Sequence, residues 1–194
     1  MLDVGAAQGF LGQLLHDSGR IIDAVEPDAD CCRIARPFYR HVHHATIEDA
    51  PLAGPYRTIV CADVLEHTPD PSGILRRLKA VAAPDALFII SLPNVAHIAV
   101  RLMLLCGRFP RMDRGPLDRT HLQFYTRDTA ADLLESAGLS VRSVLAAGVP
   151  PDEVFRGRAE SSFVRVLASA QAALVRLMPR AFAMQFIFVA SPRS

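Results

Sequence analysis

The first feature of the chain is a glycine-rich turn between a short apolar run and a helical pattern. Met1 to Val4 predicts a strand, and Asp3-Val4-Gly5-Ala6-Ala7-Gln8-Gly9 leads into a helix expected over residues 9–18. Glycine and alanine let a ligand approach the backbone closely, and the first helical turn offers N–H groups that lack partners. The turn therefore predicts a ligand site at the edge of an α/β fold.

Strand and helix patterns alternate along the rest of the chain. Such alternation predicts a Rossmann-like, doubly wound sheet of about seven mostly parallel strands, covered by helices. The length of 194 residues indicates a single domain, 1–194. In the first helix, Phe10, Leu11, Leu14 and Leu15 are expected to face the core. In the helix near the C-terminus, the expected inward face is Phe163, Leu167, Ala170, Leu174 and Leu177. Further strands are predicted at 21–25, 41–46, 58–62, 87–91, 139–146 and 184–190, and Asp28 and Thr126 are expected to cap helices.

The connection after the fifth predicted strand is about thirty residues longer than usual. We interpret residues 94–125 as a substrate-side insertion. From Arg101 to Arg127 there are six arginines against two aspartates, although the net charge of the whole chain is only +1. This local excess favours an anionic substrate, held by Arg111, Arg114 and Arg119, over nucleic acid. The alternative is a solvated arginine-rich loop.

The cysteines and the apolar segments favour a cytoplasmic protein. The four cysteines include no CxxC pair, and no signal peptide pattern precedes the turn. The most apolar stretch is interrupted by Pro93, Asn94, His97 and Arg101, which makes it a poor membrane span but leaves peripheral contact open. His41 and His43 share a strand face without a third ligand nearby, so no metal site is predicted.

An acid after the second predicted strand indicates which cofactor the turn serves. Glu26 can accept both hydroxyls of a ribose. A dinucleotide template fits the turn poorly, because Ala7 replaces its first glycine. The D-x-G-x-G-x-G template of S-adenosylmethionine (SAM) sites matches at Asp3, Gly5 and Gly9. Asp3 suits the cationic ammonium of SAM and would repel a pyrophosphate, so SAM is favoured over NAD.

Several segments resemble successive motifs of class I SAM-dependent methyltransferases. They are Leu2 to Gly9, Glu26-Pro27, Ile47-Glu48-Asp49, Ile59 to His67 and Ser91 to His97. The stretch GRFPRMDRGPLDRTHLQFYT resembles a branch found beside glycosyltransferases of surface-polysaccharide assembly. The resemblance implies an antiparallel last strand. It also implies a helix and a longer strand before the turn, so we expect that the N-terminus is truncated.

The resemblance also implies a role for each matching position. Asp3, Gly5, Ala6 and Gly9 would lie along the methionine half of SAM. Glu26 would hold the ribose and Pro27 would lie beside the adenine. The N–H of Ile47 would meet the adenine edge, with help from Thr46 or Glu48, and Ala62 would lie under the methyl donor.

The implied reaction is O-methylation of a sugar or a related small metabolite. A hydroxyl acceptor must lose its proton, for which histidine is the usual side chain near neutral pH. The candidates are His121 in the insertion, His67 after the fourth strand and His97 after the fifth, and we favour His121. His67 could instead have a structural role. Two other functions stay open: a catalytically inactive methyltransferase-like partner module, and an NAD(P)-dependent oxidoreductase.

Overall fold

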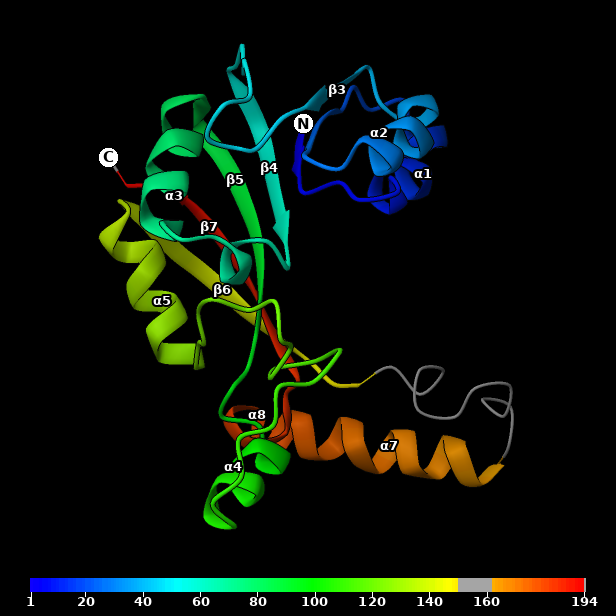
Figure 1. The fold of residues 1–194 in the computed structure, drawn as a ribbon, viewed down its shortest axis with the longest axis vertical. Helices are drawn as coiled ribbons and strands as arrows, with labels where there is room; N and C mark the ends of the chain where they lie inside the picture. The colour runs from blue at the N-terminus through cyan, green and yellow to red at the C-terminus, as the bar shows by residue number, and fades with distance from the viewer. Residues whose placement is uncertain (150–161, 194) are drawn as a thin grey trace.

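The computed structural model describes residues 1–149 and 162–193. Its centre is a seven-stranded sheet with the order β3-β2-β1-β4-β5-β7-β6 (Figure 1). The first five strands pair in parallel, and β7 is antiparallel to both of its neighbours. This confirms the predicted sheet, including its antiparallel last strand. The strands are β1 (Leu2–Val4), β2 (Asp23–Glu26), β3 (His41–His44), β4 (Tyr56–Ala62), β5 (Ala82–Pro93), β6 (Leu139–Ala147) and β7 (Gln185–Pro192).

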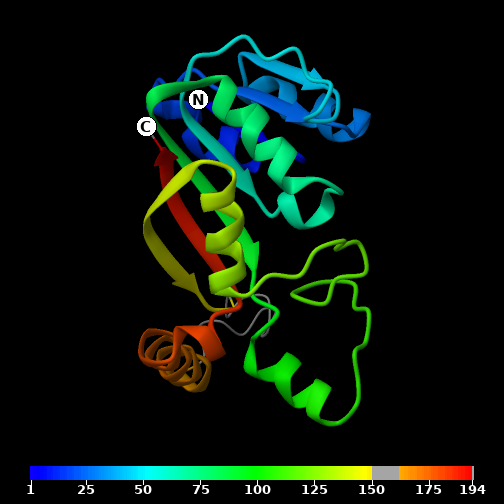
Figure 2. The ribbon, with the colours of Figure 1, turned by 90° about the vertical axis from the view of Figure 1, so that its left-hand side faces the viewer.

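Helices cover both faces of the sheet and extend below its lower end. The helices α3 and α5 lie on one face, and α1 and α2 lie on the other side (Figures 1 and 2). The helices α4, α7 and α8 gather beyond the lower ends of β4 and β5. Their bounds are α1 (Phe10–Leu15), α2 (Ala29–Ala35), α3 (Pro71–Ala80), α4 (Ile98–Leu105), α5 (Arg127–Ser136), α7 (Ser162–Leu177) and α8 (Pro179–Phe182).

The larger of two hydrophobic clusters joins the sheet to α3 and α5. Phe88 and Phe188, from β5 and β7, are fully buried in it together with Leu75 of α3 and Leu134 of α5. The predicted helix starts at Asp28 and Thr126 are also confirmed. The Asp28 carboxylate accepts from Cys31 N at 2.8 Å, and the Thr126 hydroxyl accepts from Thr129 N at 3.2 Å. Each cap satisfies an N–H that the helix itself leaves without a partner.

The predicted inward face of α1 is wrong at Phe10 and Leu14, whereas Leu11 is partly buried and Leu15 packs against the smaller hydrophobic cluster. Phe10 and Leu14 are 68% and 81% exposed, and the buried residue of the helix is Gly12. A Cβ at Gly12 would lie 2.6 Å from ring atoms of Tyr39. The helix therefore approaches its neighbour through a bare backbone, which a count of apolar side chains does not reveal.

The predicted inward face of α7 is also wrong at its leucines. Val164 and Val175 are buried, whereas Leu174 and Leu177 are 40% and 77% exposed. The side chain of Phe163 lies outside the described residues. Within residues 1–149 and 162–193, no helix combines the length and the apolar character needed to cross a membrane.

Candidate functional site

Glu26, at the end of β2, fastens the glycine-rich turn to the segment that follows β2. Its Oε2 accepts from Ala7 N at 2.8 Å and its Oε1 accepts from Asp28 N at 2.9 Å. Ala7 has a φ of 46°, a left-handed conformation that few residues with a side chain adopt. One buried carboxylate therefore sets the shape of two loops at the same edge of the sheet.

A cavity of about 410 Å³ opens beside these loops. This volume falls in the range of small-molecule sites. Val64 and Thr68, from the segment after β4, also line it. Six of the predicted cofactor residues line it: Gly5, Glu26, Pro27, Thr46, Ile47 and Glu48. Residues from three separate loops thus meet where the sequence predicts the cofactor.

The other predicted cofactor residues do not line this cavity, and Asp3 is the most informative of them. Asp3 is 4% exposed, and its carboxylate accepts the hydroxyl of Tyr39 at 2.5 Å. Burial raises the pKa of Asp3 to about 6, although the Tyr39 hydrogen bond opposes the rise. Its contact with the methionine half of SAM therefore stays a prediction. The same holds for Ala6, Gly9 and Ala62, which also lie away from the cavity lining.

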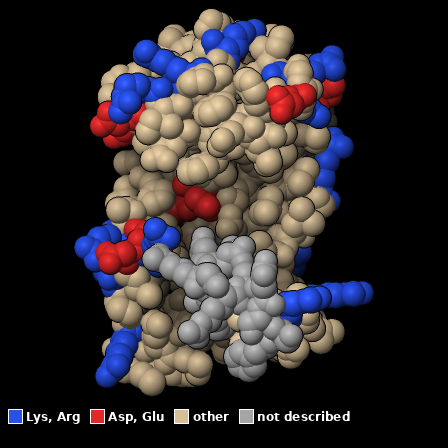
Figure 3. All heavy atoms as spheres, turned by 90° about the vertical axis from the view of Figure 1, so that its right-hand side faces the viewer, with Lys and Arg blue, Asp and Glu red and all other residues tan. Residues whose placement is uncertain are grey.

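A second cavity of about 570 Å³ adjoins the first. Asp63 and His67 line both cavities, so the two spaces share a wall. The second cavity also has Glu66, Arg114, Asp118 and His121 in its lining, the last three from the predicted insertion. Figure 3 shows a hollow across the middle of one face of the molecule, with acidic atoms at its floor.

Asp63 is held firmly at the junction of the two cavities. Its φ of 54° is unusual for a residue with a side chain, and such strain occurs often at functional sites. Ser91 Oγ donates to Asp63 Oδ1 at 2.9 Å, and Gln185 Nε2 donates to the same atom at 3.1 Å. Neighbours on β5 and β7 thus fix the position of the carboxylate.

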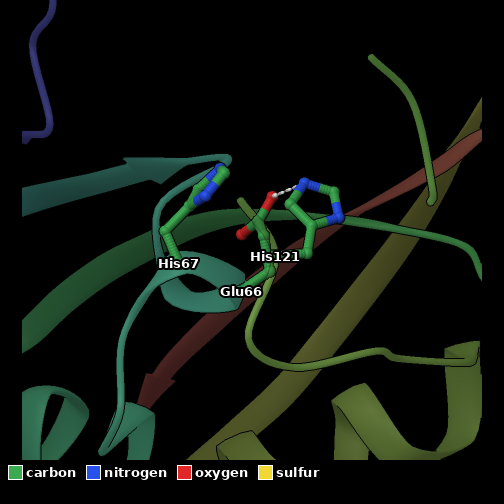
Figure 4. A group of neighbouring side chains, drawn as sticks. All are labelled: Glu66, His67 and His121. Carbon is green, nitrogen blue, oxygen red and sulfur yellow. Dashed lines mark ion pairs between the residues drawn. The ribbon is translucent and has the colours of Figure 1, made fainter. Parts of the chain in front are cut away.

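Glu66 connects the insertion to the short helical turn η3 (Leu65–His67) that follows β4. The carbonyl oxygen of Glu66 accepts from Leu122 N at 2.8 Å and from Gln123 N at 3.1 Å. These bonds bring His121 to η3, where its ring centroid lies 4.8 Å from that of His67 (Figure 4). The structure therefore brings together the two predicted catalytic histidines, which are 54 positions apart.

The Glu66 carboxylate lies beside this pair of imidazoles (Figure 4). Its Oε1 is 4.0 Å from His121 Nε2, which is too far for a hydrogen bond. Glu66 is 0% exposed, and among the described residues its two carboxylate oxygens and His121 Nδ1 have no hydrogen-bond partner. Burial raises the pKa of Glu66 to about 8, and burial, together with the nearby His67, lowers the pKa of His121.

Sequence reasoning missed Glu66 as a site residue. The signal was present in the run Val64-Leu65-Glu66-His67, because a carboxylate there follows the buried strand β4. The pattern alone did not indicate which polar side chain of the run turns inward. The third histidine considered, His97, lies elsewhere: its Nδ1 accepts from Ala99 N at 3.2 Å and caps α4.

The three predicted substrate arginines occupy different environments. Arg111 donates to the carbonyl oxygens of Arg119 and His121 at 2.7 and 3.0 Å, so it supports the insertion. Arg119 pairs with Asp113. Arg114 lines the second cavity and forms no ion pair within the part of the chain that the structure describes. Of the three, Arg114 is thus the one that lines the second cavity, and its contact with a substrate stays a prediction.

Comparisons with known families and proteins agree with this geometry. Residues 1–144 match the family described as "Methyltransferase domain". The ubiquinone biosynthesis O-methyltransferase of Haemophilus ducreyi is 26% identical over 121 residues, which cover 56% of this chain and 51% of that protein. The corresponding protein of Aeromonas salmonicida is 25% identical over 154 residues, 74% of this chain and 64% of that protein. The chain thus spans about half to two thirds of the length of these curated relatives.

Solved structures show the same fold at lower identity. A SAM-dependent methyltransferase from Archaeoglobus fulgidus has a TM-score of 0.66 and 15% identity, over 98% of this chain and 84% of that chain. Magnesium protoporphyrin IX methyltransferase from Synechocystis, solved with bound SAH, has a TM-score of 0.65 and 17% identity, over 100% of this chain and 73% of that chain. The predicted fold class is therefore confirmed.

Proposed function

Because the chain belongs to the methyltransferase domain family, we propose that it transfers the methyl group of SAM to a hydroxyl of a sugar or a related small metabolite. The observation that carries the proposal is the wall shared by the two cavities, formed by Asp63 and His67. A cofactor in the first cavity and an acceptor in the second would meet at that wall. Methyl transfer needs the acceptor oxygen, the methyl group and the sulfur in line, so such a junction supplies what the reaction mainly requires.

The first cavity suits SAM through the groups on its lining. Glu26 lines the cavity, and its hydrogen bonds to Ala7 N and Asp28 N leave further lone pairs that could accept the ribose hydroxyls. Ile47 and Pro27 line the same cavity and offer apolar contact for the adenine. The presence of these residues in one cavity supports the proposal.

The second cavity suits a polyhydroxyl acceptor. Among the described residues, its lining carries the carboxylates of Asp63 and Asp118, the amide of Gln185 and one cation, Arg114. Carboxylates and amides accept or donate several hydrogen bonds to neighbouring hydroxyls. The similarity to O-methyltransferases supports an oxygen acceptor. We propose that His121 and His67 promote loss of the hydroxyl proton.

The test is a thermal-shift series on the purified chain with SAM, S-adenosylhomocysteine and NADH. A ligand at a hundred times its Kd should raise Tm by roughly 5–10 °C for a chain of this size. We expect a shift with the first two ligands that Glu26→Gln greatly reduces. Glu135→Gln, at an exposed position of α5 outside the lining of both cavities, is the matched control and should keep the shift. A shift with NADH alone would overturn the proposal in favour of an oxidoreductase.

A further inference from the structure

We propose that Glu66, His67 and His121 form a binding site for a divalent first-row transition-metal ion. Each of the three side chains offers one ligand atom, and these atoms lie within 4.8 Å of one another. Figure 4 shows the three side chains grouped together, with the carboxylate of Glu66 beside the two imidazoles. The inference deepens the proposed function, because it names how the acceptor side of the same site would work.

The distance between Glu66 and His121 is close to that between two ligands of one ion. Zinc lies about 2.0–2.2 Å from imidazole nitrogen and carboxylate oxygen, so two ligand atoms of a tetrahedral site lie about 3.3–3.6 Å apart. The 4.0 Å between Glu66 Oε1 and His121 Nε2 exceeds hydrogen-bond length and is about half an ångström longer than this ligand spacing. The longest separation in the cluster is at most 4.8 Å and must shorten by about 1 Å on binding, a movement that the exposed side chain of His67 can supply.

The burial of the Glu66 carboxylate is a second, independent observation in favour of a metal site. Both carboxylate oxygens of Glu66 are inaccessible and lack a hydrogen-bond partner among the described residues, as does His121 Nδ1. A buried polar group without a partner costs free energy, so native structures rarely leave one unexplained. An ion between the carboxylate and the imidazoles would satisfy the carboxylate. Arg114, in the same cavity lining, makes no ion pair with Glu66.

The donor set indicates the class of ion. Two imidazoles and one carboxylate suit zinc, manganese, iron(II) or cobalt, whereas magnesium prefers a shell of oxygen atoms. Three protein ligands also leave coordination positions open, as catalytic rather than structural metal sites do. Glu66, His67 and His121 all line the second cavity, so an open position would face the proposed acceptor.

Such an ion would explain how the acceptor hydroxyl becomes a nucleophile. A hydroxyl that coordinates the ion loses its proton to water more readily. Its oxygen then bonds to the methyl carbon, the carbon–sulfur bond breaks, and that electron pair stays on sulfur to give neutral S-adenosylhomocysteine. The two histidines act as ligands in this scheme.

The experiment measures metal binding directly on the full chain. The purified protein is stripped with a chelator and titrated with Co²⁺, whose visible absorption reports nitrogen and oxygen ligation, and Zn²⁺ is then added in competition. We expect one Co²⁺ per chain, displaced by Zn²⁺ and not by equimolar Mg²⁺. Glu66→Gln and His121→Ala should each weaken Co²⁺ binding at least about tenfold. Removal of a residue that only hydrogen-bonds to a metal ligand already lowers metal affinity about tenfold or more, and the loss of a ligand should cost at least as much.

His43→Ala is the matched control, because it removes a histidine from the other pair, on β3, without touching the cluster. It should leave Co²⁺ binding unchanged. Loss of binding in His43→Ala, equal binding in Glu66→Gln, or no Co²⁺ binding by the parent chain would each overturn the metal site. Glu66→Gln keeps the buried volume, so it still tests the site if His121→Ala does not fold. A retained S-adenosylhomocysteine shift without Co²⁺ binding would reject the metal site and leave the proposed function standing.

Discussion

The hydroxyl of Tyr39 joins the carboxylate of Asp3 to the backbone of α1. It donates to Asp3 Oδ2 at 2.5 Å and accepts from Gly12 N at 2.9 Å, and all three groups are buried. Strand β1 and helix α1 flank the glycine-rich turn, so the Tyr39 hydroxyl links the elements at both ends of the turn. Tyr39 therefore helps to hold the glycine-rich turn in shape.

Replacing Tyr39 by phenylalanine tests the importance of this link. Tyr39→Phe leaves a buried carboxylate and a buried N–H without their partner, which costs about 1–3 kcal/mol. We expect the free energy of unfolding, measured in urea, to fall by that amount. Tyr125→Phe is the control, because the Tyr125 side chain is also largely buried but makes no hydrogen bond within the described residues. Equal losses in the two variants would contradict the role given to the Tyr39 hydroxyl.

The raised pKa of Asp3 predicts a stability change with pH. Its pKa rises from 3.8 to about 6 because burial disfavours the charged form. The folded state then holds this proton to a higher pH than the unfolded state does, so Asp3 lowers stability as pH rises from about 4 to about 6. The full cost, about 3 kcal/mol, is present at pH 7.

Asp3→Asn removes this titration while keeping the size of the side chain. The measurement is urea unfolding of parent and variant at several values between pH 4 and pH 7. We expect the free energy of unfolding of the parent to fall relative to that of Asp3→Asn across this window. If the two curves stay parallel, the carboxyl does not titrate in this range in the folded state.

Local patterns predicted the parts of the fold that depend on neighbours in sequence. The alternation of strands and helices, the glycine-rich turn and the caps at Asp28 and Thr126 are of this kind, because a few consecutive residues determine each. The partner of Asp3 lies 36 positions away, so no local pattern indicated that Tyr39 would bind the carboxylate. The predicted contact of Asp3 with the cofactor assumes a direction for its side chain, and the sequence carries no information about that direction.

The residues of the second cavity also owe their arrangement to contacts between distant parts of the chain, which local patterns do not predict. The candidates His67 and His121 were found from residue type and place in the chain, but their proximity depends on two hydrogen bonds to the Glu66 carbonyl. The inward turn of the Glu66 side chain depends on η3, a turn of only three residues. The different surroundings of Arg111, Arg114 and Arg119 likewise follow from the path of the insertion, for which the sequence has no periodic pattern.

The contact through which α1 packs predicts an unusual effect of alanine. Alanine favours a helix over glycine by about 1 kcal/mol. At Gly12, however, the added Cβ would lie 2.6 Å from atoms of the Tyr39 ring and 2.9 Å from Phe38 Cβ. We expect Gly12→Ala to lower the free energy of unfolding by about 1–3 kcal/mol, as overpacking does. Gln13→Ala, at an exposed neighbouring position, should stay within about 0.5 kcal/mol of the parent. A stabilised Gly12→Ala variant would show that Tyr39 moves away at little cost.

The position of Arg114 predicts how the proposed enzyme distinguishes acceptors by charge. Among the described residues, Arg114 is the one arginine or lysine on the lining of the second cavity, where the carboxylates of Asp63 and Asp118 also lie. Of the three arginines predicted to bind substrate, Arg114 is therefore the one available to an anionic group on an acceptor, since Arg111 and Arg119 are engaged within the insertion. A charge-assisted hydrogen bond contributes about 1.5–3 kcal/mol, which is tenfold or more in affinity.

We expect Arg114→Gln to raise KM about tenfold for an acidic sugar and to leave KM for its neutral counterpart nearly unchanged. Arg108→Gln, exposed and away from the cavity lining, serves as the charge-matched control. If Arg114→Gln leaves both KM values unchanged, the acceptor is recognised by the carboxylates and the amide of Gln185, and a neutral polyol fits the cavity better than an anion.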